Sequence, residues 1–245
     1  MYVLYNILIA LGCLLFGYLV GSFPTAVVIG KVFFHKDPRD YGSHNPGGTN
    51  AGRLFGKKIG VLVIVIDMIK CIAPLWITWA ILTQTGLQNV MFEGKLLLWD
   101  APLYYYLTAF GAALGHCFPI FLGFKGGKAV STFMGIICGS SWVLFLLSFL
   151  YFLYLKLKKY VSLTAILIAA THTIASWTIF IVSKFVPEAA GFVFWGWGHC
   201  LVLGAQGGWE FPTIITLMSI LVIVRHTANI KRIKEGTERK ITWMK

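Results

Sequence analysis

The sequence predicts an all-α polytopic membrane protein that forms a single domain over residues 1–245. Hydrophobic residues make up 58% of the chain, and its mean hydropathy is +0.77. A soluble domain of this length cannot bury so much apolar surface. The apolar residues are also grouped in long runs, close to the ~20 residues that a membrane-spanning helix needs. Short segments rich in Lys, Arg, Gly, Ser and Asn separate these runs.

The apolar runs predict the spans in chain order, at residues 2–22, 59–82, 98–121, 129–155, 161–183 and 213–227. No basic segment precedes the first run and no clear cleavage site follows it, so we expect it to remain as a span. The last run reaches spanning length only if Trp209–Phe211 join it. The fourth run contains Gly139-Ser140-Ser141, which favours a break into two helices. Both helices are short for a span, so we expect them to be tilted or shielded by neighbouring helices.

The distribution of Lys and Arg supports that break. With it, loops 31–58, 123–128 and 156–160 and the tail from 225 share one side, with six, two, three and seven basic residues. The other side keeps Lys95 and Lys184, and Lys70 lies within a span. Without the break, the basic residues divide about equally. Because positive charge accumulates in the cytoplasm, we predict seven transmembrane helices, with the N-terminus outside and the C-terminus cytoplasmic.

The net charge of +12 has the same origin. In a soluble protein it would suggest nucleic-acid binding, but here the charges flank apolar runs, where they set topology and meet anionic headgroups. We therefore expect a lipid bilayer and anionic substrates as partners, and no nucleic acid.

The topology of residues 184–212 is ambiguous. They are rich in Trp and Gly, which favours an interfacial or re-entrant segment, and an additional span would reverse the tail.

The loop Lys125-Gly126-Gly127-Lys128 lies between two predicted helices. Adjacent glycines let backbone N–H groups approach an oxyanion, and the following helix adds its N-terminal donors. The two lysines supply positive charge. This composition is typical of a phosphate-binding loop, although a basic turn that serves topology alone would look the same.

Loop 31–58 is longer than a connection requires. Its polar residues alternate with glycines, which indicates an ordered loop and a candidate binding surface; they include Ser43, Asn45, Thr49, Asn50 and Arg53. The guanidinium of Arg53 can bind phosphate or carboxylate through two parallel hydrogen bonds. A solvated cytoplasmic loop is the alternative interpretation.

Two polar pairs have helical spacing. Asp67 and Lys70 lie three residues apart within an apolar run, and a structural ion pair is favoured over a proton relay. His226 and Asn229 have the same spacing at the cytoplasmic end of the last predicted span. His226 could be a general base or a donor to phosphate, or it could cap a helix end.

Three motifs, taken together, resemble the acyl-phosphate-dependent glycerol-3-phosphate acyltransferases of bacteria, the PlsY family. The first motif stands as Gly21-Ser22-Phe23-Pro24, Asp37-Pro38-Arg39, Gly42 to Asn50, and Arg53. The second stands as Gly115-His116-Cys117-Phe118-Pro119, Phe121, Phe124 to Lys128, and Val130-Ser131-Thr132. The third stands as Arg225-His226, Asn229-Ile230, Arg232-Ile233, Gly236 and Glu238. They cover nearly the whole chain in the family's order.

The resemblance implies seven transmembrane helices in a bacterial cell membrane and an active site on the cytoplasmic face. It implies acyl transfer from acyl-phosphate to the 1-hydroxyl of sn-glycerol 3-phosphate, giving lysophosphatidic acid and phosphate, the first step of bacterial phospholipid synthesis. No cofactor or metal is expected. The implied catalytic residues are Ser43, Arg53, His226 and Asn229. The implied substrate- or phosphate-binding residues are Asn45, Asn50, Lys125, Gly126, Gly127, Lys128 and Ser162, with Glu238 in support.

The chain departs from the family pattern at three positions: His44 and Gly48 replace a glycine and an alanine, and Ser131 replaces an alanine. Because acyl-phosphate is already activated, we expect direct attack by the glycerol hydroxyl and no acyl-enzyme. The base is either His226 or a phosphate oxygen of the substrate.

Three rivals are weaker. The string from His35 to Asp40 and the segment Glu235-Gly236-Thr237-Glu238 resemble motifs of the acyl-CoA-dependent acyltransferases, but Pro38 disfavours a helical His–Asp pair. An anion transporter should carry more charge at mid-membrane depth. A lipid-linked phosphotransferase normally needs a cluster of metal-binding carboxylates, and the nine acidic residues are scattered.

Overall fold

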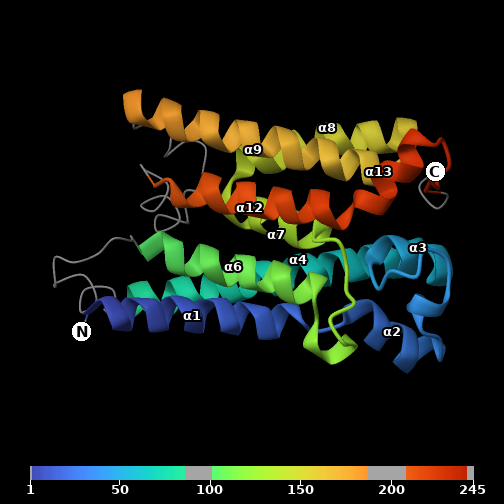
Figure 1. Cartoon of the computed structure of the whole chain (residues 1–245), viewed down its shortest axis with the longest axis horizontal. Coiled ribbons are helices and arrows are strands. Elements are labelled where there is room, and N and C mark those ends of the chain that lie inside the picture. Colours follow the sequence, from blue (N-terminus) through green and yellow to red (C-terminus); the bar gives the residue numbers. More distant parts are fainter. Residues whose placement is uncertain (1, 86–100, 187–207, 242–245) are drawn as a thin grey trace.

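The computed structural model describes residues 2–85, 101–186 and 208–241, and within these ranges the regular structure is entirely helical (Figure 1). The elements are α1 (Tyr2–Gly21), α2 (Thr25–Phe34), the 3₁₀ turn η1 (Pro38–Asp40), α3 (Gly48–Phe55), α4 (Lys57–Gln84), α6 (Ala101–Cys117), the 3₁₀ turn η2 (Ile120–Leu122), α7 (Val130–Ser140), α8 (Trp142–Lys158), α9 (Val161–Phe185), α12 (Glu210–Arg225) and α13 (Thr227–Lys234). The long helices lie side by side, which confirms the all-α class.

Four stretches in the described ranges are long and apolar enough to cross a membrane: Val3–Phe34, Lys57–Leu82, Leu103–Leu122 and Val161–Phe185. The pair α12–α13, bent by 57°, makes up to five. α12 begins at Glu210, so the residues around Trp209 do extend the last apolar run. The prediction of seven spans depends further on α7 and α8, which have 11 and 17 residues.

The predicted break in the fourth run is confirmed. α7 ends at Ser140, and Ser141 has extended backbone angles of φ −139° and ψ 119°. Its hydroxyl accepts a hydrogen bond from the N–H of Leu144, at 3.2 Å, and so caps α8. Most of α7 is buried, including Phe133, Ile136 and Ile137. Its shortness is therefore tolerated because surrounding helices cover it, as expected from the sequence.

α1 and α6 pack unusually closely through glycines. Gly17 and Gly21 face α6, while Gly111 and Gly115 face α1. A Cβ atom on any of the four would come within 1.8–2.2 Å of a carbonyl oxygen of the opposite helix. Both helices thus carry the G-x-x-x-G spacing that permits close contact in membranes. Since Gly21 and Gly115 lie at the ends of their helices, the contact also brings together the segments that follow them.

Three short helices, α2, α3 and α13, were not predicted. Alone, helices of eight to ten residues are marginal, and only their packing stabilises them. Ala26 and Ile29 of α2 are buried in a small cluster with Ala51 of α3 and Val63 of α4. α3 also lies against α4 through glycines, since a Cβ on Gly60 would lie 2.6 Å from the Cα of Gly52.

The polar elements gather at one end of the molecule. α1 begins at the end marked N, and α2, α3 and α13 lie at the opposite end (Figure 1). The predicted grouping of the first loop and the tail is therefore present in the fold. The Trp- and Gly-rich part of segment 184–212, which we predicted to be interfacial or re-entrant, lies outside the described residues apart from its two ends.

The predicted intramembrane pair is also present. The Nζ of Lys70 lies 2.9 Å from the Oδ1 of Asp67, and both side chains are buried. This confirms the ion pair that the spacing indicated.

The glycine contact predicts that one methyl group added at this interface lowers the free energy of unfolding substantially. Gly17→Ala should destabilise the fold by about 1–3 kcal/mol, because the helices must separate to admit the methyl group. Gly12→Ala on the same helix is the matched control, since nothing lies within 4 Å of its Cβ position. Thermal unfolding in detergent should show a lower midpoint for Gly17→Ala alone; equal midpoints for the two variants would contradict the packing argument.

Candidate active site

The first loop is organised around the side chain of Asn50. Its Nδ2 donates to the carbonyl oxygens of Pro38, at 2.7 Å, and Tyr41, at 3.0 Å, and its Oδ1 accepts from the N–H of Ser43 at 3.1 Å. Asn50 is only 2% exposed. The side chain of Asn50 thus holds the loop together, and its predicted contact with substrate stays a prediction.

Other predicted residues of this loop are placed differently. Asn45 lines an open cleft, and its Oδ1 is buried without a hydrogen-bond partner in the described ranges. Ser43 is exposed, and its N–H donates to Asn50. Arg53, on α3, is partly buried near Arg239 and Glu238. Burial and Arg239 lower the pKa of its guanidinium, and Glu238 opposes them.

The glycine loop is folded inward. The N–H of Gly126 donates to the carbonyl of Cys117, at 3.1 Å, and the N–H of Gly127 donates to the carbonyl of His116, at 2.8 Å. Both amides are therefore bonded within the protein in this structure, and their predicted contact with a phosphate stays a prediction. A Cβ on Gly126 would lie 2.2 Å from the His116 oxygen, so close packing is what requires glycine here.

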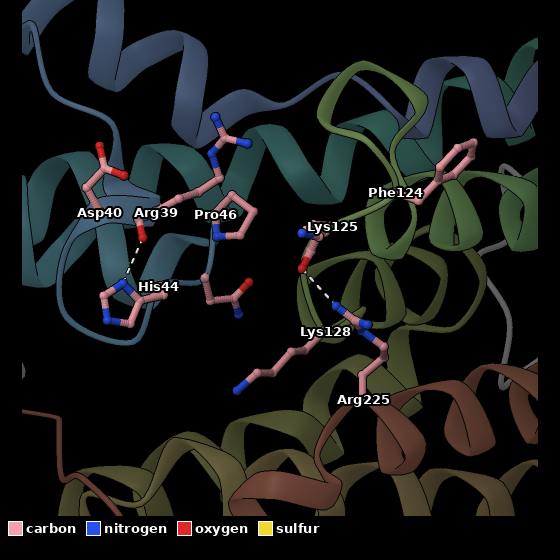
Figure 2. Close-up of a pocket in the computed structure, with 10 residues that line it drawn as sticks. Arg39, Asp40, His44, Pro46, Phe124, Lys125, Lys128 and Arg225 are labelled. Atoms are coloured by element: carbon pink, nitrogen blue, oxygen red, sulfur yellow. Dashed lines mark hydrogen bonds between the residues drawn. The ribbon is translucent and has the colours of Figure 1, made fainter.

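Arg225 holds the same loop from the other side. Its Nε donates to the carbonyl of Gly127, at 3.0 Å, and its Nη2 to the carbonyl of Gly126, at 2.9 Å (Figure 2 draws the second). The guanidinium also lies over the ring of Phe118, 5.2 Å from its centroid. The loop is thus fixed through both its donors and its acceptors, which places Lys128 at a defined position.

Lys128 and three other predicted residues form one hydrogen-bonded network. Its Nζ donates to the Oδ1 of Asn229 at 2.7 Å. The Nδ2 of Asn229 donates to the Oγ of Ser162, at 3.1 Å, and to the Oε1 of Glu238, at 2.7 Å. The Ser162 hydroxyl also donates to Glu238. Residues from the second loop, α9, α13 and the tail therefore meet at a single point.

Charge in this network is unevenly distributed. Burial alone would raise the pKa of Glu238, but hydrogen bonds from Ser162, Asn229 and Arg232 outweigh it and lower the pKa, so Glu238 is ionised at neutral pH. Its Oε2 accepts from the Nε of Arg232 at 2.8 Å. Burial lowers the pKa of Lys128 to about 8; Glu238 opposes this shift, and nearby arginines reinforce it. Lys128 is therefore charged at neutral pH but loses its proton readily.

His226 lies between α12 and α13 and is buried. Its Nδ1 is 2.7 Å from the carbonyl oxygen of Val222. Because that oxygen can only accept, Nδ1 carries the proton and Nε2 is the acceptor nitrogen.

An open cleft of about 510 Å³ lies between the first loop and the glycine loop (Figure 2). Four of its side chains are cationic, against the single carboxylate of Asp40. It is lined by Arg39, Asp40, His44, Asn45, Pro46, Phe124, Lys125, Gly126, Lys128 and Arg225. Such a surface attracts anions. Of the predicted site residues, Asn45, Lys125, Gly126 and Lys128 line this cleft.

Arg39 was missed as a site residue. It belongs to the first of the three family motifs, in Asp37-Pro38-Arg39, and that membership could have indicated a place in the site. The Nη2 of Arg39 lies 2.7 Å from the Oδ2 of Asp37, and this arginine lowers the pKa of Asp37 to about 2. His44 contacts it as well, because the Nδ1 of His44 is 2.8 Å from the Arg39 carbonyl oxygen (Figure 2).

The tail closes the site on one side. The Nη1 of Arg239 donates to the carbonyl of Gly42, at 3.0 Å, and the N–H of Ile241 donates to the carbonyl of Lys159, at 2.8 Å.

Across the described part of the chain, no group of three or more His, Cys, Asp or Glu side chains could hold a metal ion.

The family model for glycerol-3-phosphate acyltransferase matches residues 11–236. The chain belongs to the glycerol-3-phosphate acyltransferase family. The corresponding enzymes of Staphylococcus aureus strains JH9 and Newman are each 35% identical over 236 residues, which cover 94% of this chain and 97% of the relative.

Solved structures agree with this membership. The chain is similar to crystal structures of PlsY, an integral membrane glycerol 3-phosphate acyltransferase. The glycerol 3-phosphate form has a TM-score of 0.67 and 29% identity, over 95% of this chain and 96% of that one. The lysophosphatidic acid form has a TM-score of 0.66 and 28% identity, over 96% of each. The resemblance to the PlsY acyltransferases is thereby confirmed, and the protein is an integral membrane acyltransferase.

The Lys128 environment predicts how anion binding depends on pH. Because the pKa of Lys128 is about 8, its charge is present below that pH and disappears above it. A phosphate monoester, with a second pKa of about 6, keeps a nearly constant charge from pH 7.5 upward. Affinity for glycerol 3-phosphate should therefore fall by about tenfold or more between pH 7.5 and 9.5, as a charge-assisted hydrogen bond is lost. Calorimetric titration would measure it, and Lys128→Arg, which stays charged, should flatten the curve.

Glu238 should set the position of that step. Its negative charge raises the pKa of Lys128, so Glu238→Gln should move the fall in affinity to lower pH. Glu235→Gln is the matched control, because Glu235 is exposed and lies 3.9 Å from Lys231 on the surface of α13. The same titration measures both variants, and an unchanged midpoint in Glu238→Gln would contradict the assigned coupling.

Proposed function

We propose that the protein transfers an acyl group from acyl-phosphate to the 1-hydroxyl of sn-glycerol 3-phosphate. The products are lysophosphatidic acid and inorganic phosphate, as in the first step of bacterial phospholipid synthesis. The observation that carries this proposal is the network in which Lys128, Asn229, Ser162 and Glu238 meet beside a cationic cleft. Membership in the glycerol-3-phosphate acyltransferase family supports it.

The cations serve both substrates, since each carries a phosphate. Lys128 and Arg53 bind phosphate oxygens, and Lys125 and Arg39 add positive potential around the cleft. Arg225 acts indirectly by fixing the carbonyls of the glycine loop. Charge neutralisation of a departing phosphate and orientation of the hydroxyl are what an activated acyl donor requires.

The reaction needs no covalent enzyme intermediate. The oxygen of the glycerol hydroxyl attacks the acyl carbonyl carbon, its proton passes to a base, and the bond from that carbon to the phosphate oxygen breaks. Asn229, Ser162 and Ser43 orient the substrate. The Nε2 of His226 can accept the proton, since Nδ1 carries the ring proton that is donated to the carbonyl of Val222. A phosphate oxygen of the substrate is the alternative base.

We also propose that seven helices span a bacterial plasma membrane, with the N-terminus outside and the site in the cytoplasm. The separation of α1's start from the polar end of the molecule supports this orientation (Figure 1). The basic loops at that end then obey the positive-inside rule.

The donor can be tested directly. Purified protein in detergent, given radiolabelled glycerol 3-phosphate and either palmitoyl-phosphate or palmitoyl-CoA, should form lysophosphatidic acid only with palmitoyl-phosphate. Product from palmitoyl-CoA alone would overturn the proposed donor. Absence of product with both would contradict the proposed reaction and favour an anion transporter.

A substitution of His226 distinguishes the two bases. If His226 is the base, His226→Gln should abolish turnover and leave the affinity for glycerol 3-phosphate near that of the wild type. General bases contribute about 10²–10⁴-fold to rates. Retained turnover would assign the proton to a phosphate oxygen of the substrate. Single-turnover kinetics with calorimetry would measure the two quantities separately.

A further inference from the structure

A buried polar cluster that the proposed reaction does not use lies beneath the glycine loop. It consists of Asp67 and Lys70 on α4 and His116 at the end of α6, which are 1%, 8% and 7% exposed. The Oδ1 of Asp67 accepts from the hydroxyl of Thr25, at 2.8 Å, and pairs with Lys70, at 2.9 Å. Lys70 also donates to the carbonyl of Phe23, at 3.1 Å. The cluster thereby ties α4 to the junction between α1 and α2.

The second carboxylate oxygen of Asp67 faces His116. This Oδ2 is buried and has no hydrogen-bond partner within the described ranges, and it lies 3.8 Å from the Nδ1 of His116. Burying an acceptor in this way is costly unless it faces a positive or donor group. The orientation of the carboxylate therefore favours a ring whose Nδ1–H points toward Asp67 and whose Nε2 points away from it.

The far edge of the His116 ring meets Gly127. A Cβ on Gly127 would lie 2.0 Å from the Nε2 of His116 and 2.7 Å from both adjacent ring carbons. The main chain of His116 contacts the same residue, since its carbonyl accepts the N–H of Gly127 at 2.8 Å. His116 thus supports Gly127 through its ring and its carbonyl, one residue before Lys128.

The ring has little room to move away. The cavity that Asp67, Lys70, His116 and both loop glycines line has a volume of only about 10 Å³. On the opposite side of the loop, Arg225 binds the carbonyls of the two glycines. The loop is therefore held between the His116 ring and the Arg225 guanidinium.

We infer that His116 is a positioning residue for acyl transfer. Its ring sets the position of Gly127, and through it that of the Lys128 ammonium, while the Asp67–Lys70 pair keeps the ring in place. The inference rests on the proposed function, because it assigns Lys128 to substrate phosphate. His116 does not line the cationic cleft. It and the Asp67–Lys70 pair act on the reaction only through the position of Lys128.

A cycle of two substitutions tests this assignment. Gly127→Ala should lower kcat/KM by about 10²-fold, the effect of displacing a binding group by about 1 Å. His116→Ala should lower it by about tenfold, chiefly by raising KM for glycerol 3-phosphate, since Lys128 loses its defined position. In the double variant the methyl group occupies the space that the ring has left. Its kcat/KM should exceed that of Gly127→Ala by at least about tenfold, a coupling expected only for groups in contact.

His172→Ala is the matched control in the Gly127→Ala background. His172 is a second buried histidine, on α9, whose Nε2 lies 2.9 Å from the Oγ of Ser148 on α8. It should give no rescue. Gel-filtration profiles and thermal midpoints in detergent would establish that every variant is folded. If His116→Ala does not fold, His116→Asn replaces it in the cycle, because the shorter side chain also vacates the Nε2 position.

The outcomes separate this inference from the proposed function. Wild-type activity is first measured with palmitoyl-phosphate and palmitoyl-CoA, and the cycle then uses whichever donor is active, so an error about the donor leaves the cycle intact. Rescue by removal of His116 alone supports the positioning role. Losses that are independent in folded double variants, or equal rescue by His172→Ala, would overturn it.

Discussion

The glycine contact between α1 and α6 is the constraint on which the site depends. Gly17 and Gly21 face the backbone of α6, and Gly111 and Gly115 face the backbone of α1, at distances that admit no Cβ atom. In a bilayer, where helices gain little from apolar burial against each other, such close packing stabilises the pair. The contact continues to the ends of both helices and places the α1–α2 junction beside His116. The first loop and the glycine loop thus begin from one rigid base.

Above this base, the positive charge of Lys128 stays available to an anion, because two nearby carboxylates pair with arginines. Glu238 pairs with Arg232, and Asp37 pairs with Arg39. Lys128 instead donates to the neutral amide oxygen of Asn229. An amide orients the ammonium without cancelling its charge, so the ammonium can still attract phosphate. The partial burial that lowers its pKa also strengthens its interaction with an anion, since the local dielectric is lower than in water.

The sequence predicted features that depend on long-range averages and missed those that depend on local packing. Apolar runs and the distribution of Lys and Arg were sufficient to locate the long helices and the break before Ser141, because both reflect the transfer of whole segments into a bilayer. α2 and α3 could not be predicted, since their stability comes from contacts with α4. Asn50 and Gly126 were expected to bind substrate because of the family resemblance and, for Gly126, because of the pattern of the glycine loop. The structure shows that their polar groups bond internally, a choice that only the folded loop decides.

Backbone geometry explains one departure from the family pattern in the first loop, and packing explains the other. His44, which replaces a glycine, has φ of +55°, a conformation that costs a residue with a side chain about 1–2 kcal/mol. Its hydrogen bond to the Arg39 carbonyl, worth about 1 kcal/mol, offsets most of this. At position 48, where the family has alanine, a Cβ would lie 2.4 Å from Ile64, so glycine permits the bulkier neighbour on α4. Each departure is thus accompanied by a specific contact nearby, the hydrogen bond of His44 and the close packing of Gly48 on Ile64.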